Sequence, residues 1–209
     1  MQSLRAAALV CAVIVSLTAA AGTYNPERSI GDVIPAWKDL QGVDGKTHGW
    51  DEVADRDFVV VVFTCNSCPY AVDYEGRVEA LAARAGAAGS RFAVVAINSN
   101  RIPEDTLPAM KRRAEAKKYS FPYLFDETQE VARSFGAVRT PECFILDRDR
   151  RIVYMGAIDD SPDAARVTKR FVDEALVALT AGGTVTVSET APVGCMIRYD
   201  RGRKGGRPR

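Results

Sequence analysis

Two uninterrupted apolar runs stand out in the first half of the 209-residue chain, at residues 58–63 and 92–97. Their length and β-branched content are typical of strands buried on both faces of a sheet. Between them, over residues 69–86, apolar residues recur at spacings of three and four, which predicts an amphipathic helix. These apolar positions are Ala71, Tyr74, Val78, Leu81 and Ala85. The pattern therefore predicts a strand–helix–strand unit with two parallel strands.

The second half of the chain predicts further helices and an antiparallel pair of strands. The predicted elements are helices at residues 106–118, 127–135 and 162–179, and a β-hairpin of residues 143–146 and 152–155. Strands that alternate with helices, followed by a hairpin and a last helix, predict an α/β fold. We therefore expect a central mixed sheet flanked by helices.

Two cysteines, Cys65 and Cys68, stand where the first predicted strand gives way to the first predicted helix. Three residues apart on a first helical turn, their sulfurs can meet. A helix start presents unpaired N–H groups and the positive end of the helix dipole, and both favour thiolate over thiol. We therefore expect a lowered pKa at Cys65, which makes it the nucleophile. The arrangement predicts a dithiol that cycles with a disulfide.

Two other interpretations of this pair stay open. An exported protein could keep it as a structural disulfide. A zinc site would need two more ligands, and the other candidates are His48, Cys143 and Cys195. Haem attachment requires a histidine directly after the second cysteine, where this chain has Pro69. No metal or organic cofactor is implied.

Residues 1–21 have the pattern of a signal peptide. Arg5 precedes an uncharged apolar stretch, and small residues at Ala19 and Ala21 offer a cleavage site before Gly22. We expect export to the periplasm or the extracellular space, and an uncleaved membrane anchor is the alternative. An oxidising compartment would require a redox partner to keep the dithiol reduced, or use of the pair as an oxidant.

The rest of the chain divides into a predicted domain at residues 22–183 and an extension at 184–209 with a basic end. Six basic residues and one acidic residue occupy the last twelve positions, and the formal net charge of the whole chain is +1. A near-neutral chain with a short basic tail argues against nucleic-acid binding.

The cysteine pair and a later Thr140-Pro141 segment together resemble the thioredoxin fold. More closely, the chain resembles its exported peroxiredoxin-like branch, grouped with the alkyl hydroperoxide reductase and thiol-specific antioxidant proteins. The matching stretches are residues 63–78, 94–100, 121–147 and 194–199. The resemblance implies a cis peptide bond at Thr140-Pro141, beside the cysteine pair, and a docking surface for substrate there.

The activity implied is that of a thiol–disulfide oxidoreductase. Cys65 would attack, Cys68 would resolve the mixed disulfide, and the partners would be thiol or disulfide-containing proteins and a redox partner. One alternative is a peroxiredoxin-like peroxidase, in which Cys68 or Cys195 resolves an oxidised Cys65. Another is a metal-binding module that uses its thiols as ligands.

The chain departs from both family patterns at two positions. Val59 stands where thioredoxins usually carry a buried acid, and Val62 stands where peroxiredoxins carry a threonine three residues before their cysteine. The missing threonine weakens the peroxidase interpretation.

Two cysteines lie outside the motif. Cys143 stands in a predicted buried strand, where a small thiol is usually inert. Cys195 could be a free surface thiol, a partner for Cys143 or a resolving thiol. We expect its segment to fold back through Val185, Val187 and Ile197, and Cys195 to be dispensable for exchange at the pair.

Overall fold

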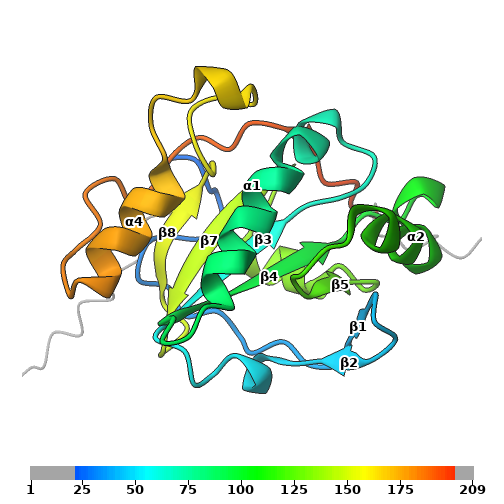
Figure 1. Ribbon diagram of the computed structural model, residues 1–209, viewed down its shortest axis with the longest axis horizontal. Helices are drawn as coiled ribbons and strands as arrows, with labels where there is room; N and C mark the ends of the chain where they lie inside the picture. The colour runs from blue at the N-terminus through cyan, green and yellow to red at the C-terminus, as the bar shows by residue number, and fades with distance from the viewer. Residues whose placement is uncertain (1–21, 201–209) are drawn as a thin grey trace, which may run out of the picture.

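The computed structural model describes residues 22–200, so the expected signal peptide and the basic end at 201–209 lie outside the described residues. Seven strands form one sheet in the order β2-β1-β5-β4-β3-β7-β8 (Figure 1). The strands are β1 (Leu40–Gly42), β2 (Thr47–His48), β3 (Phe58–Phe63), β4 (Phe92–Asn98), β5 (Tyr123–Phe125), β7 (Glu142–Asp147) and β8 (Ile152–Gly156). Two more strands, β6 (Arg139–Thr140) and β9 (Cys195–Met196), form a small second sheet.

The main sheet is mixed, as the sequence predicts. β3 runs parallel to β4, with Phe58 opposite Phe92, and β4 runs parallel to β5. On its other side β3 pairs antiparallel with β7, which pairs antiparallel with β8. β3 therefore lies inside the sheet, and its side chains belong to the cores on both faces, which explains its continuous hydrophobicity.

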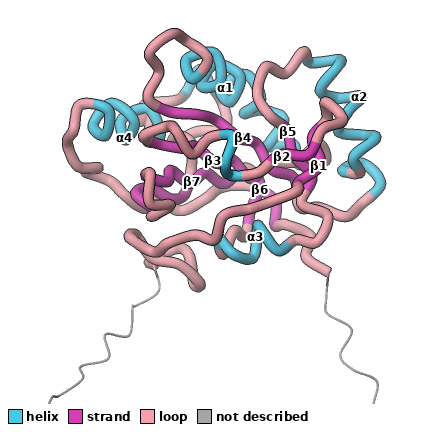
Figure 2. Tube along the Cα trace, turned by 90° about the horizontal axis from the view of Figure 1, so that it is seen from below, coloured by secondary structure: helices cyan, strands magenta, loops and turns pink. Residues whose placement is uncertain are grey.

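Helices cover both faces of this sheet. α1 (Pro69–Ala85) and α4 (Phe171–Thr180) lie on one face, and α3 (Glu130–Phe135) lies on the other, as Figure 2 shows. α2 (Leu107–Lys117) lies beyond β5. Successive side chains of β3 alternate between the faces. Val60 and Val62 belong to the core under α1 and α4, whereas Val61 belongs to the core on the side of α3.

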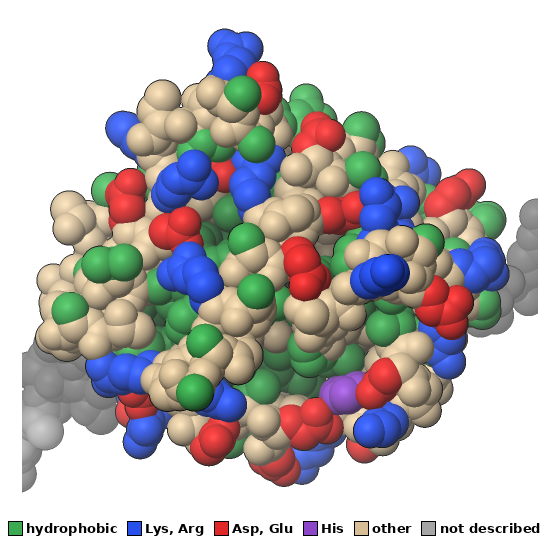
Figure 3. All heavy atoms as spheres, viewed as in Figure 1, with side chains coloured by type: hydrophobic (Ala, Val, Ile, Leu, Met, Phe, Trp, Pro, Cys, Tyr) green, Lys and Arg blue, Asp and Glu red, His purple; other side chains and the backbone are tan. Residues whose placement is uncertain are grey.

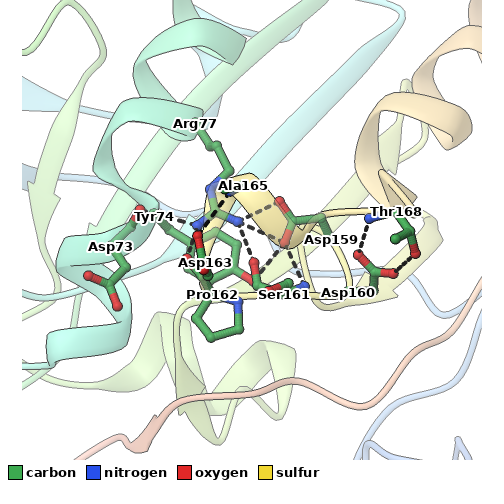
Figure 4. A network of polar contacts seen from close by, with 10 residues as sticks. All are labelled: Asp73, Tyr74, Arg77, Asp159, Asp160, Ser161, Pro162, Asp163, Ala165 and Thr168. Carbon is green, nitrogen blue, oxygen red and sulfur yellow. Dashed lines mark hydrogen bonds and ion pairs between the residues drawn. The ribbon is translucent and has the colours of Figure 1, made fainter.

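The expected long helix at 162–179 is wrong over its first half. Only Ala164–Arg166 form a short 3-10 turn there, and α4 begins at Phe171. The preceding loop is instead held to α1 by side chains (Figure 4). Tyr74 donates a hydrogen bond to Asp159 at 2.8 Å, and Arg77 of α1 also binds Asp159. These contacts with a buried carboxylate hold the loop before α4 against α1. A continuous helix from residue 162 would not keep the loop in this conformation.

The segment after α4 folds back on the domain. Thr190 donates its backbone N–H to Met155 of β8 at 3.0 Å, and Ile197 is buried in the core on the α3 side. Val185 packs partly against the other core, as expected, but Val187 is exposed, so the prediction for Val187 is wrong. Residues 184–200 are therefore packed against the main sheet and contribute β9 to the small second sheet.

The described surface has charges of both signs. Figure 3 shows Lys and Arg side chains interspersed with Asp and Glu over the face that α1 and α4 cover. Some of them join elements, as Arg84 of α1 does with Asp173 of α4. No helix within residues 22–200 has the length and apolar character needed to cross a membrane.

Candidate active site

Cys65 and Cys68 lie in the connection between β3 and α1. β3 ends at Phe63, and α1 begins at Pro69 with Cys68 as its N-cap residue. Both cysteines are free thiols, and they are only 4% and 2% exposed. They pack together with Ala71 and, at the edge of the cluster, Cys195. The fold therefore brings the two sulfurs of the predicted dithiol into one small buried group at the carboxyl end of a central strand.

Thr140 contacts both thiols. Its hydroxyl oxygen lies 3.3 Å from the Sγ atom of Cys65, and its carbonyl oxygen accepts a hydrogen bond from the Cys68 thiol at 3.0 Å. The Thr140–Pro141 peptide bond is cis, which confirms that prediction. The two residues expected at the docking surface therefore lie directly against the cysteine pair.

The strand edge at Thr140 is already paired with the chain's own C-terminal segment. Thr140 lies opposite Cys195, and Arg139 lies opposite Met196, in the antiparallel pairing of β6 with β9. A substrate segment that docked on this edge would have to displace β9. The structure thus places Cys195, which sequence reasoning left open, beside the dithiol.

The pKa of Cys68 is shifted down and that of Cys65 up, the reverse of the order expected from the sequence. The pKa of Cys68 is lowered by its hydrogen bond with Cys65 and by the N–H groups of Ala71 and Cys195. The pKa of Cys65 is raised by the same hydrogen bond, by burial and by the negative charge of Asp105. α1 begins only at Pro69, so its first N–H donors lie nearest the N-cap residue Cys68. The Cys68 sulfur also donates to the Thr140 carbonyl, so the choice of the attacking thiol stays a prediction.

A buried carboxylate, Asp105, supports the loop that holds the cysteines. It accepts hydrogen bonds from the backbone N–H groups of Asn66 and Ser67, at 2.7 and 3.1 Å, and from the Asn100 side chain at 2.9 Å. Asp105 is completely buried. Sequence reasoning missed this residue. Its signal was a run of polar residues, from Asn98 to Asn100, at the end of β4, the strand that neighbours β3.

A second buried acid, Glu142, directly follows the cis-proline. It pairs in register with Phe63 at the end of β3, and it accepts hydrogen bonds from the backbone N–H groups of Val138 and Arg139 at 2.7 and 2.9 Å. Burial raises its pKa to about 7, against the lowering effect of these two donors. Sequence reasoning missed Glu142 too, although a single charge at the start of an apolar strand could have revealed it.

Cys143 is completely buried in the core under α1, where it lies opposite Val62. Burial raises the pKa of this thiol, so it stays protonated and unreactive in the folded chain. Within residues 22–200, no group of three or more His, Cys, Asp or Glu side chains is arranged to hold a metal ion.

A mixed sheet flanked by helices, with a Cys-x-x-Cys pair before its first long helix and a cis-proline beside that pair, defines a protein of the thioredoxin-like fold. The Redoxin family model matches residues 29–174, and the chain belongs to that family. It is therefore an oxidoreductase related to the peroxiredoxins.

Solved structures agree with this assignment. A hypothetical protein from Sinorhizobium meliloti 1021 is 36% identical, over 84% of this chain and 97% of that chain, with a TM-score of 0.74. An uncharacterized conserved protein from Geobacillus kaustophilus is also 36% identical, over 83% and 93% of the two chains, with a TM-score of 0.76. The peroxidoxin BcpB from Mycobacterium tuberculosis shares the fold at 23% identity, over 73% and 96%, with a TM-score of 0.56. No curated protein matches the chain.

Proposed function

We propose that this chain is a thiol–disulfide oxidoreductase that works by cycling Cys65 and Cys68 between a dithiol and a disulfide. The observation that carries the proposal is the contact of both free thiols with Thr140, at 3.3 Å from its hydroxyl and 3.0 Å from its carbonyl. Two sulfurs held beside one residue are placed to form and break a bond with little movement of the backbone.

The reaction starts from the thiol with the lower pKa, Cys68. Cys68 gives up the proton that it donates to the Thr140 carbonyl, and its thiolate attacks one sulfur of a substrate disulfide. A mixed disulfide forms, and the first substrate thiolate leaves and takes up that proton. Cys65 then attacks the Cys68 sulfur, the second substrate thiolate leaves, and the Cys65 proton passes to a departing thiolate. The substrate gains two electrons, and the enzyme retains a Cys65–Cys68 disulfide. A redox partner restores the dithiol by the reverse sequence.

We place this activity outside the cytoplasm, on the basis of the signal-peptide pattern at residues 1–21. The mature chain would begin near Gly22. Mass measurement of the exported protein should give that N-terminus. A mass that retains residues 1–21 would instead support a membrane anchor.

A thiol peroxidase is the second candidate, and the burial of the site favours it. Cys65 and Cys68 are almost completely buried, and β9 occupies the strand edge at Thr140. A peroxide molecule needs far less space at these thiols than an extended peptide, which would have to displace β9. In this reaction a cysteine thiolate attacks one peroxide oxygen, the O–O bond breaks, and the other oxygen leaves as water or an alcohol. The resulting sulfenic acid then reacts with a neighbouring thiol to form the disulfide with loss of water.

The decisive experiment measures the rate at which the reduced protein reduces glutathione disulfide, and separately hydrogen peroxide. Cys65→Ser and Cys68→Ser should each lower the disulfide-reducing turnover at least a hundredfold. Cys143→Ala is the matched control, because it removes a buried thiol away from the site, and it should stay within about twofold of the unmodified chain. Full activity in Cys68→Ser would overturn the proposal. Turnover of peroxide but not of the disulfide would favour the peroxidase.

A further inference from the structure

Cys195 lies against the dithiol because the end of the chain is fixed there. Its backbone N–H points at the Sγ atom of Cys68 from 3.4 Å, and its side chain completes the cluster of Cys65, Cys68 and Ala71. Cys195 is partly exposed, whereas Cys65 and Cys68 are buried. Cys195 is thus the member of the cluster that reaches the surface, next to a buried pair.

The contacts of residues 194–200, called the C-terminal strap below, hold Cys195 at this place. Arg139 donates a side-chain hydrogen bond to the carbonyl of Gly194 at 2.8 Å, and Ile197 donates its N–H to the carbonyl of Val138 at 2.9 Å. Ile197 itself is buried, which fixes the strap to the core two residues after Cys195.

The far end of the strap is fixed as well. Gln129, itself buried, donates its side-chain amide to the carbonyl of Arg198 at 2.9 Å and accepts the N–H of Asp200 at 2.7 Å. Asn100 accepts the N–H of Arg198 at 2.8 Å. Contacts on both sides of Cys195, made by three separate parts of the domain, make its position beside Cys68 a built feature of the fold.

The geometry points to Cys195 as a third redox thiol, which takes over the disulfide by bonding to Cys68 and passes it to the redox partner at the surface. This inference rests on the proposed function, because it needs the Cys65–Cys68 disulfide as its starting state. It replaces the expectation that Cys195 is dispensable.

The transfer balances without any added electron. The Cys195 thiolate attacks the Cys68 sulfur, the Cys68–Cys195 bond forms, and the Cys65–Cys68 bond breaks. Cys65 leaves as a thiolate and takes up the proton that Cys195 released. A dithiol partner then attacks the exposed Cys195 sulfur, Cys68 leaves as a thiolate, and the second thiol of the partner releases Cys195. The partner supplies the two electrons and becomes a disulfide.

The electrostatics support this order of events. In the reduced chain the pKa of Cys195 is raised, first by its hydrogen bond with Cys68, while the positive charges of Arg198 and Arg139 lower it. Once Cys68 is part of a disulfide, its negative charge is gone and the two arginines remain. Cys195 therefore becomes a better nucleophile when there is a disulfide to attack. Cys68, whose pKa is lowered, is the better leaving group in the next step.

The test maps disulfides in full-length variants oxidised with diamide. Cys65→Ser should give a Cys68–Cys195 disulfide as its main product. Its matched control, Cys68→Ser, keeps Cys65 and Cys195 but lacks the central sulfur, and it should give no bridge between them. A main product other than Cys68–Cys195 in Cys65→Ser would overturn the inference.

A kinetic measurement tests the same inference independently. Cys195→Ser, and Cys195→Ala as a second variant, should still form the Cys65–Cys68 disulfide. Their re-reduction by dithiothreitol should be at least tenfold slower than in the unmodified chain. Unchanged re-reduction in folded variants would overturn the third-thiol role but leave the proposed function intact. Loss of disulfide reduction by the unmodified chain would instead reject the proposed function itself.

Discussion

The buried carboxylate of Asp105 accepts a hydrogen bond from the hydroxyl of Ser67 at 2.6 Å, inside the Cys-x-x-Cys loop. The same carboxylate accepts the backbone N–H groups of Asn66 and Ser67, so both residues between the two cysteines are fixed by one acid. The Ser67 hydroxyl is also 3.7 Å from the Sγ atom of Cys65. Asp105 therefore couples the shape of the loop to the electrostatics of Cys65.

Replacement of Asp105 by Asn should make Cys65 more acidic. The negative charge of Asp105 is one of the causes that raise the pKa of Cys65, after the hydrogen bond with Cys68 and burial. Asp105→Asn removes the charge and keeps one acceptor oxygen for the loop, so we expect Cys65 to react several-fold faster with iodoacetamide at neutral pH. The lost hydrogen bonds should lower the free energy of unfolding by about 1–3 kcal/mol.

The control for this variant is Ser67→Ala, which keeps the charge of Asp105 and removes one of its donors. It should leave the reactivity of Cys65 close to that of the unmodified chain. Equal rates at Cys65 in Asp105→Asn and the unmodified chain would show that the charge of Asp105 does not reach the thiol.

The thiolate of the reduced pair should reside on Cys68. Its pKa is lowered by the Cys65 hydrogen bond and by N–H donors, whereas the pKa of Cys65 is raised. In Cys65→Ser a hydroxyl still donates to Cys68, so thiolate absorbance at 240 nm should appear well below the ordinary cysteine pKa. In Cys65→Ala, which lacks the donor, it should appear at higher pH. A lower titration midpoint for Cys65 in Cys68→Ser than for Cys68 in Cys65→Ser would reverse the assignment.

The parts of the fold predicted well from the sequence are those with a strong periodic pattern. The apolar run of β3 and the three- and four-residue spacing of α1 predict the ends of both elements to within one residue of the observed ends. The helix expected from residue 162 failed because Asp159 binds Arg77 of α1, and such a long-range ion pair leaves no trace in local periodicity.

The candidate site was predicted only in part. Cys65, Cys68 and Thr140-Pro141 belong to motifs that can be recognised in the sequence, and the structure brings them together. Asp105 lies far from the cysteines in sequence, and only the hydrogen bonds from Asn66 and Ser67 show that it is near the site. Glu142 adjoins the Thr140-Pro141 motif, but its place opposite Phe63 depends on the pairing of strands. Cys195 was named as a candidate, but its contact with Cys68 depends on the pairing of β6 with β9. Each of these strands has two residues, which is too short for a sequence pattern to predict.

Glu142 should make the chain more stable in mild acid than at neutral pH. Burial raises its pKa from 4.5 to about 7, so the folded chain binds a proton more tightly than the unfolded chain does. The resulting stabilisation is fully present below pH 4.5 and is lost as the pH rises through 7. Within that window the contribution falls by as much as about 1.4 kcal/mol per pH unit.

Glu142→Gln is the matched variant for this prediction. Its amide oxygen can still accept the N–H groups of Val138 and Arg139, but it has no proton to lose. Urea unfolding between pH 4.5 and 7 should therefore show a smaller fall in stability with rising pH than the unmodified chain shows. Contributions from other groups, such as His48, cancel in this comparison. Parallel curves for the two proteins would assign the pH dependence to another residue.

Gly194 should control how tightly the C-terminal strap covers Cys68. A Cβ atom at this position would lie 2.0 Å from the carbonyl oxygen of Thr140, an approach that the backbone must move to relieve. Gly194→Ala should therefore push the strap away from β6, weaken the contact of Cys195 with Cys68, and raise the rate of Cys68 alkylation several-fold. The free energy of unfolding should fall by about 1–3 kcal/mol, because a crowded contact is strained.

Gly76→Ala is the control, because it makes the same chemical change in the middle of α1, where an added Cβ atom meets nothing within 4 Å. Alanine favours a helix over glycine by up to about 1 kcal/mol, so this variant should be slightly more stable, with unchanged Cys68 reactivity. The two substitutions should thus have opposite effects on the free energy of unfolding, and only Gly194→Ala should change the alkylation rate of Cys68. If Cys68 reacts at the same rate in both, close packing of the strap against Thr140 does not shield the thiol, and the burial of Cys68 must come from Thr140 and α1 alone.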